Sequence, residues 1–553
     1  MPTSWYQTIP NILNHIIMEN PASILDIGIG FGKYGFLSRE MLELPYERYQ
    51  KEQWTVRIDG VEAFESYKNP IHEFVYNDIY YGDILETIDQ LPSYDVILLI
   101  DVLEHFTKED GKRLLEKLVK HTNKALIVST PIFPAEQEEY LGNKYEEHKS
   151  RWSITDLVDF SFTYEEFLIG GNGAHIFKFY PKVEQQQKSI DQLLISKTGI
   201  INANKKLVVT FVLPHHVLTG GLKMLLQQMK ELRKRGHVVQ AALRSDEGPV
   251  LPSWLDLSVD KQILIPSTEN YLPYLAGSDI IVAGWFDQLH ELQNDDIPVF
   301  YWEQGHEWLF GDIVSQYETE VVRNHLQLNY EQNIVLTAVS PIISKLLESN
   351  YGRKCIVLPN FIDTHFYHPA IDKVEDDELT ILLVGDPGLR FKGSDIALNA
   401  LHLVSQAGYP FKVQWVMPTL RDLGEWSFDI EYVIKPSQEE LAQLYRDADI
   451  HLFTSWYEGF GMPPLEAMAS GIPVVATNCG GISVYAKHGE NAYLVEPGDF
   501  EGLAVGLLYF MKNAAKRHEY GQKGRNTALM FEYSTGIQYL EECLIKTVEH
   551  YQK

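Results

Sequence analysis

The chain has little cysteine, little positive charge and no long apolar run, and each of these absences excludes a class of protein. Its three cysteines, Cys355, Cys479 and Cys543, are widely spaced among 553 residues and form no CxxC pair. A disulfide framework or a zinc site is therefore not expected, which suits a reducing cytoplasm. No apolar run approaches the roughly 18 residues of a membrane span, and the N-terminus lacks the basic start and apolar core of a signal peptide. We therefore expect a cytoplasmic protein.

The scarcity of positive charge narrows the range of partners. Lysine and arginine number 47 against 76 acidic residues, so the net charge is −29. Such a chain is a poor general binder of nucleic acid or anionic lipid. One predicted helix carries a basic face, formed by Lys223, Lys230, Arg233, Lys234 and Arg235. We interpret it as a solvated face, with a weak peripheral membrane contact as the alternative. The oligomeric state is left open.

Buried strands followed by helical patterns recur along the whole chain. The apolar runs are 23–28, 56–62, 94–100, 125–131, 206–214, 279–285, 333–339, 379–385, 413–418, 449–455 and 472–478. Continuous apolar runs that alternate with helices predict parallel sheets covered on both faces. We therefore expect an α/β protein with three Rossmann-like doubly wound units. The predicted domains are 1–185, a Gln-rich linker at 186–204, 205–368, and 369–553 with a tail helix.

The first unit begins with a glycine-rich turn, ILDIGIGFGKYG at 24–35. Such a turn lets the backbone approach a ligand and points helix N–H groups at it. One glycine register, Gly30-x-Gly32-x-x-Gly35, fits the dinucleotide fingerprint. Asp26 precedes the glycines, where a carboxylate would meet a ligand ammonium, and Glu62 ends the next strand, where it would accept hydrogen bonds from ribose hydroxyls.

This order of strands and motifs resembles the class I S-adenosylmethionine-dependent methyltransferases. Their glycine motif is matched by Asp26, Gly28, Gly30 and Gly32. The resemblance implies that Glu62 binds the ribose and Asp83 lies on the adenine side, with S-adenosylmethionine as the cofactor. A predicted antiparallel hairpin at 160–180, with its turn at 170–173, fits the end of that fold. A dinucleotide-binding unit, or an inactive unit that serves as a binding or scaffold module, remains the alternative.

The base for methyl transfer is not fixed by any motif. His105 follows the strand at 94–100 and His148 lies in YEEHKSRW, so either imidazole is a candidate for removing a hydroxyl proton. A structural role is the competing interpretation for both.

The third unit carries a stronger signal. The loop VGDPGLRFKGSD at 384–395 presents Arg390 and Lys392 together, which suits a diphosphate. The strand at 449–455 then leads into SWYEGFGMPPLEAMASG, in which Glu458 and Glu466 flank a glycine loop. Prolines suit the first helical turn that follows, and the glycines let backbone amides face an anion.

This run resembles the C-terminal half of GT-B-fold retaining glycosyltransferases of the family-four type. Glu458 and Glu466 match their signature of two glutamates with seven residues between them. The resemblance implies that Glu466 holds the nucleotide ribose and that Glu458 lies beside the donor sugar. By the same resemblance, Phe460 and Gly461 offer backbone amides, Arg390 and Lys392 neutralise the leaving diphosphate, and Gly220 and Gly221 form the loop across the cleft.

The chain departs from the family pattern at several positions. Asp386 stands where the family usually has arginine, Lys223 stands where an acid is common, and Phe361 replaces a glycine. His306 falls near the family's cleft histidine, with a structural role as the alternative. Asp447-Ala448-Asp449 is formally a DxD, but it sits at a helix end, and no metal is expected where a helix dipole and cations carry the phosphate charge.

The two resemblances together imply a bifunctional glycan-modifying enzyme for polysaccharide or glycoconjugate synthesis. A retaining transfer would move sugar from a nucleotide-sugar donor to a hydroxyl of a carbohydrate or glycoconjugate acceptor. Methylation from S-adenosylmethionine, on a sugar hydroxyl, would be the second activity. A nucleotide-sugar phosphorylase or synthase, or a carbohydrate-binding scaffold with decayed sites, are the alternatives.

Overall fold

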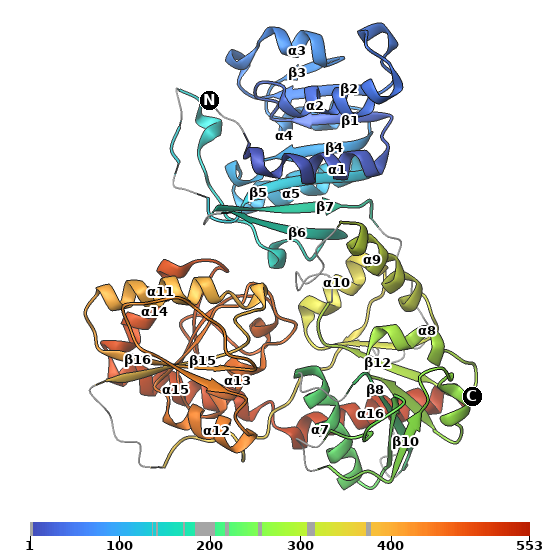
Figure 1. Cartoon of the computed structure of the whole chain (residues 1–553), viewed down its shortest axis with the longest axis vertical. Helices are drawn as coiled ribbons and strands as arrows, with labels where there is room; N and C mark the ends of the chain where they lie inside the picture. The colour runs from blue at the N-terminus through green and yellow to red at the C-terminus, as the bar shows by residue number, and fades with distance from the viewer. Residues whose placement is uncertain are drawn as a thin grey trace. The chain divides into compact units, whose positions relative to one another are not determined.

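The computed structural model describes residues 4–134, 137–139, 142–169, 172–182, 205–215, 220–252, 257–306, 316–371 and 378–552. The chain divides into two compact units, 1–184 with 311–321, and 185–310 with 322–553. Figure 1 shows the strands and helices of each part in chain order from blue to red. The predicted linker 186–204, and residues 170 and 171 of the predicted hairpin turn, lie outside the described residues.

The first unit is built on one seven-stranded sheet with the order β3-β2-β1-β4-β5-β7-β6. The strands are β1 (Ser23–Ile27), β2 (Arg57–Glu62), β3 (Ile79–Tyr81), β4 (Tyr94–Ile100), β5 (Thr122–Pro131), β6 (Phe162–Ile169) and β7 (Asn172–Phe179). The first five run parallel, whereas β7 pairs antiparallel with both β5 and β6. The predicted hairpin is confirmed as β6 and β7, and β7 is inserted between β5 and β6.

Helices flank this sheet (Figure 1). They are α1 (Ile9–Glu19), α2 (Lys33–Leu42), α3 (Pro70–Val75), α4 (Ile84–Thr87) and α5 (Lys108–Lys120). In β4 every residue except Asp95 is buried, as its continuous apolar run predicts. In α5 the buried residues Leu114, Leu115 and Leu118 form one stripe, because positions three and four apart share a helix face. The sheet therefore has a closed core, and its ligand-binding edge lies at the carboxyl ends of the parallel strands.

The second unit contains two further sheets. The first has the order β10-β9-β8-β11-β12-β13-β14 and the second the order β17-β16-β15-β18-β19-β20. The strands of the first are β8 (Val208–Leu213), β9 (Val238–Arg244), β10 (Lys261–Ile265), β11 (Ile280–Ala283), β12 (Val299–Glu303), β13 (Val335–Ala338) and β14 (Ile356–Val357). Those of the second are β15 (Leu379–Val384), β16 (Phe411–Met417), β17 (Ile430–Ile434), β18 (Ile450–Phe453), β19 (Val474–Thr477) and β20 (Tyr493–Val495). All the described pairings in both sheets are parallel.

The helices of the second unit connect these strands. They are α7 (Gly220–Lys234), α8 (Leu289–Leu292), α9 (Gln316–Tyr330), α10 (Pro341–Tyr351), α11 (Ser394–Gln406), α12 (Gln438–Asp447), α13 (Met462–Ala469), α14 (Phe500–Met511), α15 (Ala514–Leu529) and α16 (Tyr533–Tyr551). The predicted tail helix is α16, and it contacts α7 beside the sheet at the other end of the unit. Glu541 on α16 accepts a hydrogen bond from His237 Nε2, at 2.7 Å.

The predicted fold class is confirmed, since all eleven apolar runs form strands of three parallel-rich sheets. Several cations of the predicted basic face form ion pairs, with Arg233 on Asp260, Lys234 on Glu231 and Arg235 on Glu541. A membrane contact of this face stays a prediction. Among the helices the structure describes, none combines the length and the apolarity needed to cross a bilayer.

Candidate functional site

The two glutamates of the predicted donor site lie in the loop between β18 and α13 and on α13 itself. The strand β18 is buried throughout, and α13 begins at Met462, so the prolines fall in its first turn as predicted. Gly461 has φ +80°, and a Cβ on it would lie 2.6 Å from the Ile482 side chain. A glycine is therefore required where the loop turns into the helix.

Glu458 lies in this loop and pairs with Lys392, which is predicted to bind the donor diphosphate. Its Oε1 accepts hydrogen bonds from Lys392 Nζ at 2.6 Å and from Ser455 Oγ at 2.9 Å. Lys392 belongs to a short 3-10 helix, Arg390–Lys392, which is tied to β18 by a hydrogen bond from the Thr454 hydroxyl to the Lys392 carbonyl oxygen. The structure thus brings Lys392 and Glu458 together, as the prediction of one shared site requires.

Arg390 belongs to the same 3-10 helix and is solvent-exposed. Asp386, at the position where the family usually has arginine, accepts a hydrogen bond from the Gly388 amide and lies 3.7 Å from Arg421 Nε. Arg421 follows β16 and was not singled out by any motif. Arg421 places a second guanidinium beside the loop at 384–395, where Asp386 replaces the arginine that the family usually has.

Glu466 is almost fully buried on α13. Its Oε1 accepts from Lys223 Nζ at 3.2 Å and its Oε2 from the Tyr445 hydroxyl at 3.1 Å. Lys223 Nζ also lies 3.3 Å from the Tyr367 hydroxyl. Lys223 stands where the family commonly has an acid. The Lys223 side chain reaches from α7 to Glu466, the residue predicted to bind the ribose.

Both glycine segments of the predicted cleft lie next to Gln304. Gln304 Nε2 donates to the Gly221 carbonyl oxygen at 3.3 Å, and a Cβ on Gly459 would overlap the Gln304 carbonyl oxygen. Around Gly220 a Cβ would meet no described atom. The Phe460 ring points into the core, where it packs 5.3 Å from the Tyr485 ring, so only its backbone can serve a ligand.

His306 is confined to the core beside β12. Its Nε2 lies 3.1 Å from the Tyr351 hydroxyl, and its side chain is 1% exposed. Burial lowers the pKa of His306 to about 3, so the ring is neutral. These contacts fit the structural alternative, and no described contact joins His306 to Glu458 or Glu466.

The first unit has a cavity of about 790 Å³ at the carboxyl ends of β1, β2 and β4. The predicted residues that line it are Asp26, Gly28, Gly30, Glu62, Asp83, His105 and His148. Gly32 caps α2 with φ +87° and is outside the lining. The structure therefore gathers seven residues, predicted from separate motifs, around one space large enough for a nucleoside ligand.

The acidic groups of this cavity are held by local hydrogen bonds. Asp26 Oδ2 accepts from the Tyr76 hydroxyl at 2.6 Å, and burial raises the pKa of Asp26 to about 6. Glu62 accepts from the amides of Gly30 at 3.0 Å and Phe64 at 2.9 Å, and burial likewise raises its pKa. Asp83 caps α4 by accepting from the Leu85 amide. Each carboxylate keeps lone pairs for a ligand.

Two acidic residues that line the cavity, Asp101 and Glu104, were not singled out by any motif. Asp101 has φ +52°, and its carboxylate accepts from the Ser129 hydroxyl at 2.8 Å and from the Trp5 amide at 3.1 Å. Asp101 and Glu104 both lie in IDVLEHF, where His105 drew attention first. Two acids directly after a buried strand were the available signal, because such positions face the ligand edge of a parallel sheet.

Comparisons with known proteins concern the second unit. Residues 429–527 match the family described as glycosyl transferases group 1. The chain is 30% identical over 184 residues to MMP alpha-(1->4)-mannosyltransferase of Mycolicibacterium hassiacum, which is 31% of this chain and 43% of that protein. It is 36% identical over 90 residues to N-acetyl-alpha-D-glucosaminyl L-malate synthase of Bacillus anthracis, which is 16% and 24% respectively. The chain thus spans less than half the length of these curated relatives.

A solved structure extends the likeness to the fold. Sucrose-phosphate synthase from Thermosynechococcus elongatus superposes with a TM-score of 0.50 at 18% identity, over 61% of this chain and 98% of that one. Glu458 and Glu466 lie inside the matched segment 429–527. The last two sheets of this chain therefore form a GT-B pair, and its C-terminal part is similar to the group 1 glycosyl transferases.

Proposed function

We propose that the second unit transfers a sugar from a nucleotide-sugar to a hydroxyl of a carbohydrate or glycoconjugate acceptor, with retention of the anomeric configuration. The observation that carries the proposal is the Lys392–Glu458 ion pair beside the Gly459–Gly461 loop, inside the segment that matches the group 1 family. The relatives named above transfer or join sugars by their printed names, which supports the same reaction class.

The mechanism follows from where charge develops. In the transition state the sugar becomes oxocarbenium-like and negative charge accumulates on the departing diphosphate. Lys392, together with Arg390, would stabilise that diphosphate, while Glu458 would orient the donor sugar. Glu466 would accept hydrogen bonds from the ribose hydroxyls. Lys223 already binds Glu466, so donor binding must either share this carboxylate or displace the ammonium.

The acceptor proton has no dedicated base in this scheme. His306 is neutral in the core and bonded to Tyr351, so it is a poor candidate. We follow the family resemblance instead, in which the donor phosphate helps to take the proton and attack occurs on the same face. The carboxylate pair of the hydrolases does not apply, because no covalent glycosyl intermediate is required.

The test is a transfer assay on the full chain with a panel of nucleotide-sugars and oligosaccharide acceptors. We expect free nucleoside diphosphate and a product whose anomeric configuration, measured by NMR, matches that of the donor. Glu458→Gln should suppress transfer. In a parallel assay with inorganic phosphate in place of the acceptor, a sugar 1-phosphate product would instead identify a phosphorylase. This rival has some support, because a trehalose phosphorylase of Grifola frondosa is 32% identical over 155 residues, which is 27% of this chain and 19% of that protein.

A second activity, methyl transfer from S-adenosylmethionine, is favoured by the first unit. The supporting observations are the antiparallel β7 between β5 and β6 and the cavity lined by Asp26, Glu62 and Asp83. Asp26 would bind the ligand ammonium and Glu62 its ribose. The two activities would then act on one glycan, with methylation of a hydroxyl as a cap. The proposed domains are 1–185, 205–368 and 369–553.

Calorimetry with S-adenosylhomocysteine tests the second activity. We expect one binding site per chain, weakened by Glu62→Ala, and methyl incorporation into the product of the first reaction. If the full chain fails to bind the ligand, the first unit is a scaffold module. If it methylates only an acceptor that is not a carbohydrate, the coupling of the two activities is wrong.

A further inference from the structure

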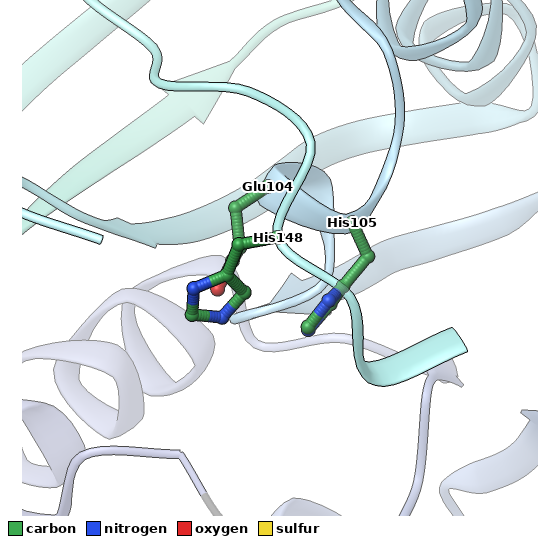
Figure 2. A group of neighbouring side chains, drawn as sticks. All are labelled: Glu104, His105 and His148. Carbon is green, nitrogen blue, oxygen red and sulfur yellow. The ribbon is translucent and has the colours of Figure 1, made fainter. Parts of the chain in front are cut away.

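Two histidines and a glutamate meet at one wall of the cavity in the first unit. The ligand atoms of Glu104, His105 and His148 all lie within 4.8 Å of one another. Figure 2 shows the three side chains directed toward a common space from two separate segments of the chain. The imidazole rings of His105 and His148 are 5.0 Å apart. From the sequence, each histidine was a candidate base by itself, and no motif singled out the glutamate.

The backbone holds the two segments together. Glu104 and His105 belong to the 3-10 helix Leu103–His105 after β4, and the Glu104 carbonyl oxygen accepts from the amides of Lys149 at 2.8 Å and Ser150 at 3.1 Å. The Ser150 hydroxyl also donates to the Phe106 carbonyl oxygen at 2.7 Å. The loop that carries His148 is therefore fastened to the turn that carries the other two side chains.

The orientation of His105 leaves one nitrogen available for a ligand. Its Nδ1 lies 3.0 Å from the Glu147 carbonyl oxygen, and only an N–H donor can make that hydrogen bond. The neutral ring then keeps its lone pair on Nε2. A backbone carbonyl in this position is the usual partner of a metal-bound histidine.

Glu104 has a buried carboxyl group, and one of its oxygen atoms lacks a hydrogen-bond donor among the described residues. The residue is 2% exposed, and its Oε2 accepts no hydrogen bond from the residues the structure describes. The Asp101 carboxylate and the Thr130 hydroxyl are both close enough to act on the Glu104 carboxyl group, and no cation is among its described interactions. A buried carboxylate without a positive charge beside it is costly, and a bound cation would supply that charge.

We propose that Glu104, His105 and His148 bind a divalent transition-metal ion in the wall of the cavity. Two imidazoles and one carboxylate suit Zn²⁺, Mn²⁺, Fe²⁺ or Co²⁺, whereas Mg²⁺ and Ca²⁺ prefer oxygen ligands. A tetrahedral ion with ligands at 2.0–2.2 Å would bring the ligand atoms to roughly 3.4 Å from one another. Small side-chain rotations from the present spacing achieve this.

The site leaves open coordination positions toward the cavity, because all three residues line it. An oxygen ligand of an acceptor, such as a sugar hydroxyl, would fill one of them and become more acidic there. This role rests on the proposed methyl transfer, whereas metal binding itself does not. It also gives both histidines a role other than that of a general base.

The experiment is a titration of the full chain, treated with chelator and freed of it, with Co²⁺ and Zn²⁺. No S-adenosylmethionine or acceptor is present, so the outcome does not depend on methyl transfer. We expect one strong equivalent per chain by calorimetry and the d–d absorption of a low-coordinate Co²⁺ ion. His148→Ala, His105→Ala and Glu104→Gln should each weaken that equivalent at least tenfold.

His121→Ala is the matched control, since this histidine belongs to the same unit but caps α5 outside the cavity lining. It should bind as the wild type does. His148 lies on a loop and is half-buried, so His148→Ala is the variant least exposed to loss of fold, which circular dichroism checks. Wild-type affinity in all three ligand variants, or the absence of a stoichiometric site in the parent chain, overturns the proposal.

Discussion

Lys392 is the residue at which structure and proposed chemistry meet most directly, since its ammonium lies 2.6 Å from Glu458 Oε1 and its side chain is 22% exposed. We expect Lys392→Ala to lower kcat for sugar transfer about 10²- to 10³-fold, because one charged contact to the leaving diphosphate is lost. Stability should fall by only about 1 kcal/mol, as is typical of a partly exposed ion pair. Arg390→Ala should act in the same direction. Steady-state kinetics and thermal unfolding measure the two effects.

Lys487→Ala is the control for this experiment. Lys487 belongs to the same unit as Lys392, its side chain is 68% exposed, and its ammonium lies 3.7 Å from the Glu490 carboxylate. Its removal should leave both kcat and stability unchanged. Full turnover in the Lys392 and Arg390 variants would remove both residues from the site.

Asp26 illustrates how a residue proposed to bind a ligand can weaken the fold that carries it. Burial raises the pKa of Asp26 to about 6 from an ordinary value of 3.8, so the folded state holds its proton where the unfolded state has released it. Stability then falls as the pH rises from about 4 to 6, by roughly 3 kcal/mol in total. Asp26→Asn should therefore raise the Tm at pH 8, and this gain should shrink toward pH 5.5.

The same substitution should weaken S-adenosylhomocysteine binding, because an amide cannot pair with the ligand ammonium as a carboxylate does. Thermal unfolding across the pH range, with and without ligand, measures both effects. A Tm gain that does not depend on pH would show that the buried charge is not its cause.

At the scale of the element, the turn between the 3-10 helix Arg390–Lys392 and α11 sets the position of the basic loop. Gly393 has φ +63°, and a Cβ on it would overlap the Thr454 carbonyl oxygen after β18. Gly393→Ala should therefore push Lys392 away from Glu458 and reduce kcat by at least tenfold, in addition to a conformational cost of about 1–2 kcal/mol.

Gly489→Ala separates these two effects. Gly489 has a similar φ of +75°, but a Cβ there would meet no described atom. It should therefore lose stability for the backbone reason alone and keep its kcat. Equal kinetic effects in the two variants would mean that the contact with Thr454 does not position the site. Initial rates at saturating donor, alongside the Tm of each variant, make the comparison.

The elements that were predictable from the sequence are those whose signal is local. β4 and β18 are continuous apolar runs, and two prolines mark the first turn of α13. The sequence pattern alone therefore predicts these three elements. β14 has two residues, and β10 has only three consecutive apolar residues and is largely exposed, so neither strand shows a long apolar run. The pairing of Lys223 with Glu466 was out of reach, because 243 positions separate them and only the folded chain brings them together.

At the scale of the whole molecule, the two proposed activities belong to two compact units of one chain. Each unit has its own sheets and core, so each should respond to its own ligand. A ligand at 100 times its Kd stabilises the state that binds it by about 2.7 kcal/mol. Differential scanning calorimetry should therefore resolve two transitions, one raised by S-adenosylhomocysteine and the other by the nucleoside diphosphate of the donor.

Variants at the two acids proposed to bind ribose assign the transitions. Glu62→Gln should abolish only the response to S-adenosylhomocysteine, and Glu466→Gln only the response to the nucleoside diphosphate, because the two carboxylates lie in different units. A transition that neither ligand moves identifies a unit that works as a scaffold. The unit to which that transition belongs then tells which activity is absent. If instead each ligand raises both transitions, the units are energetically coupled, and methylation and sugar transfer would then regulate each other by linkage.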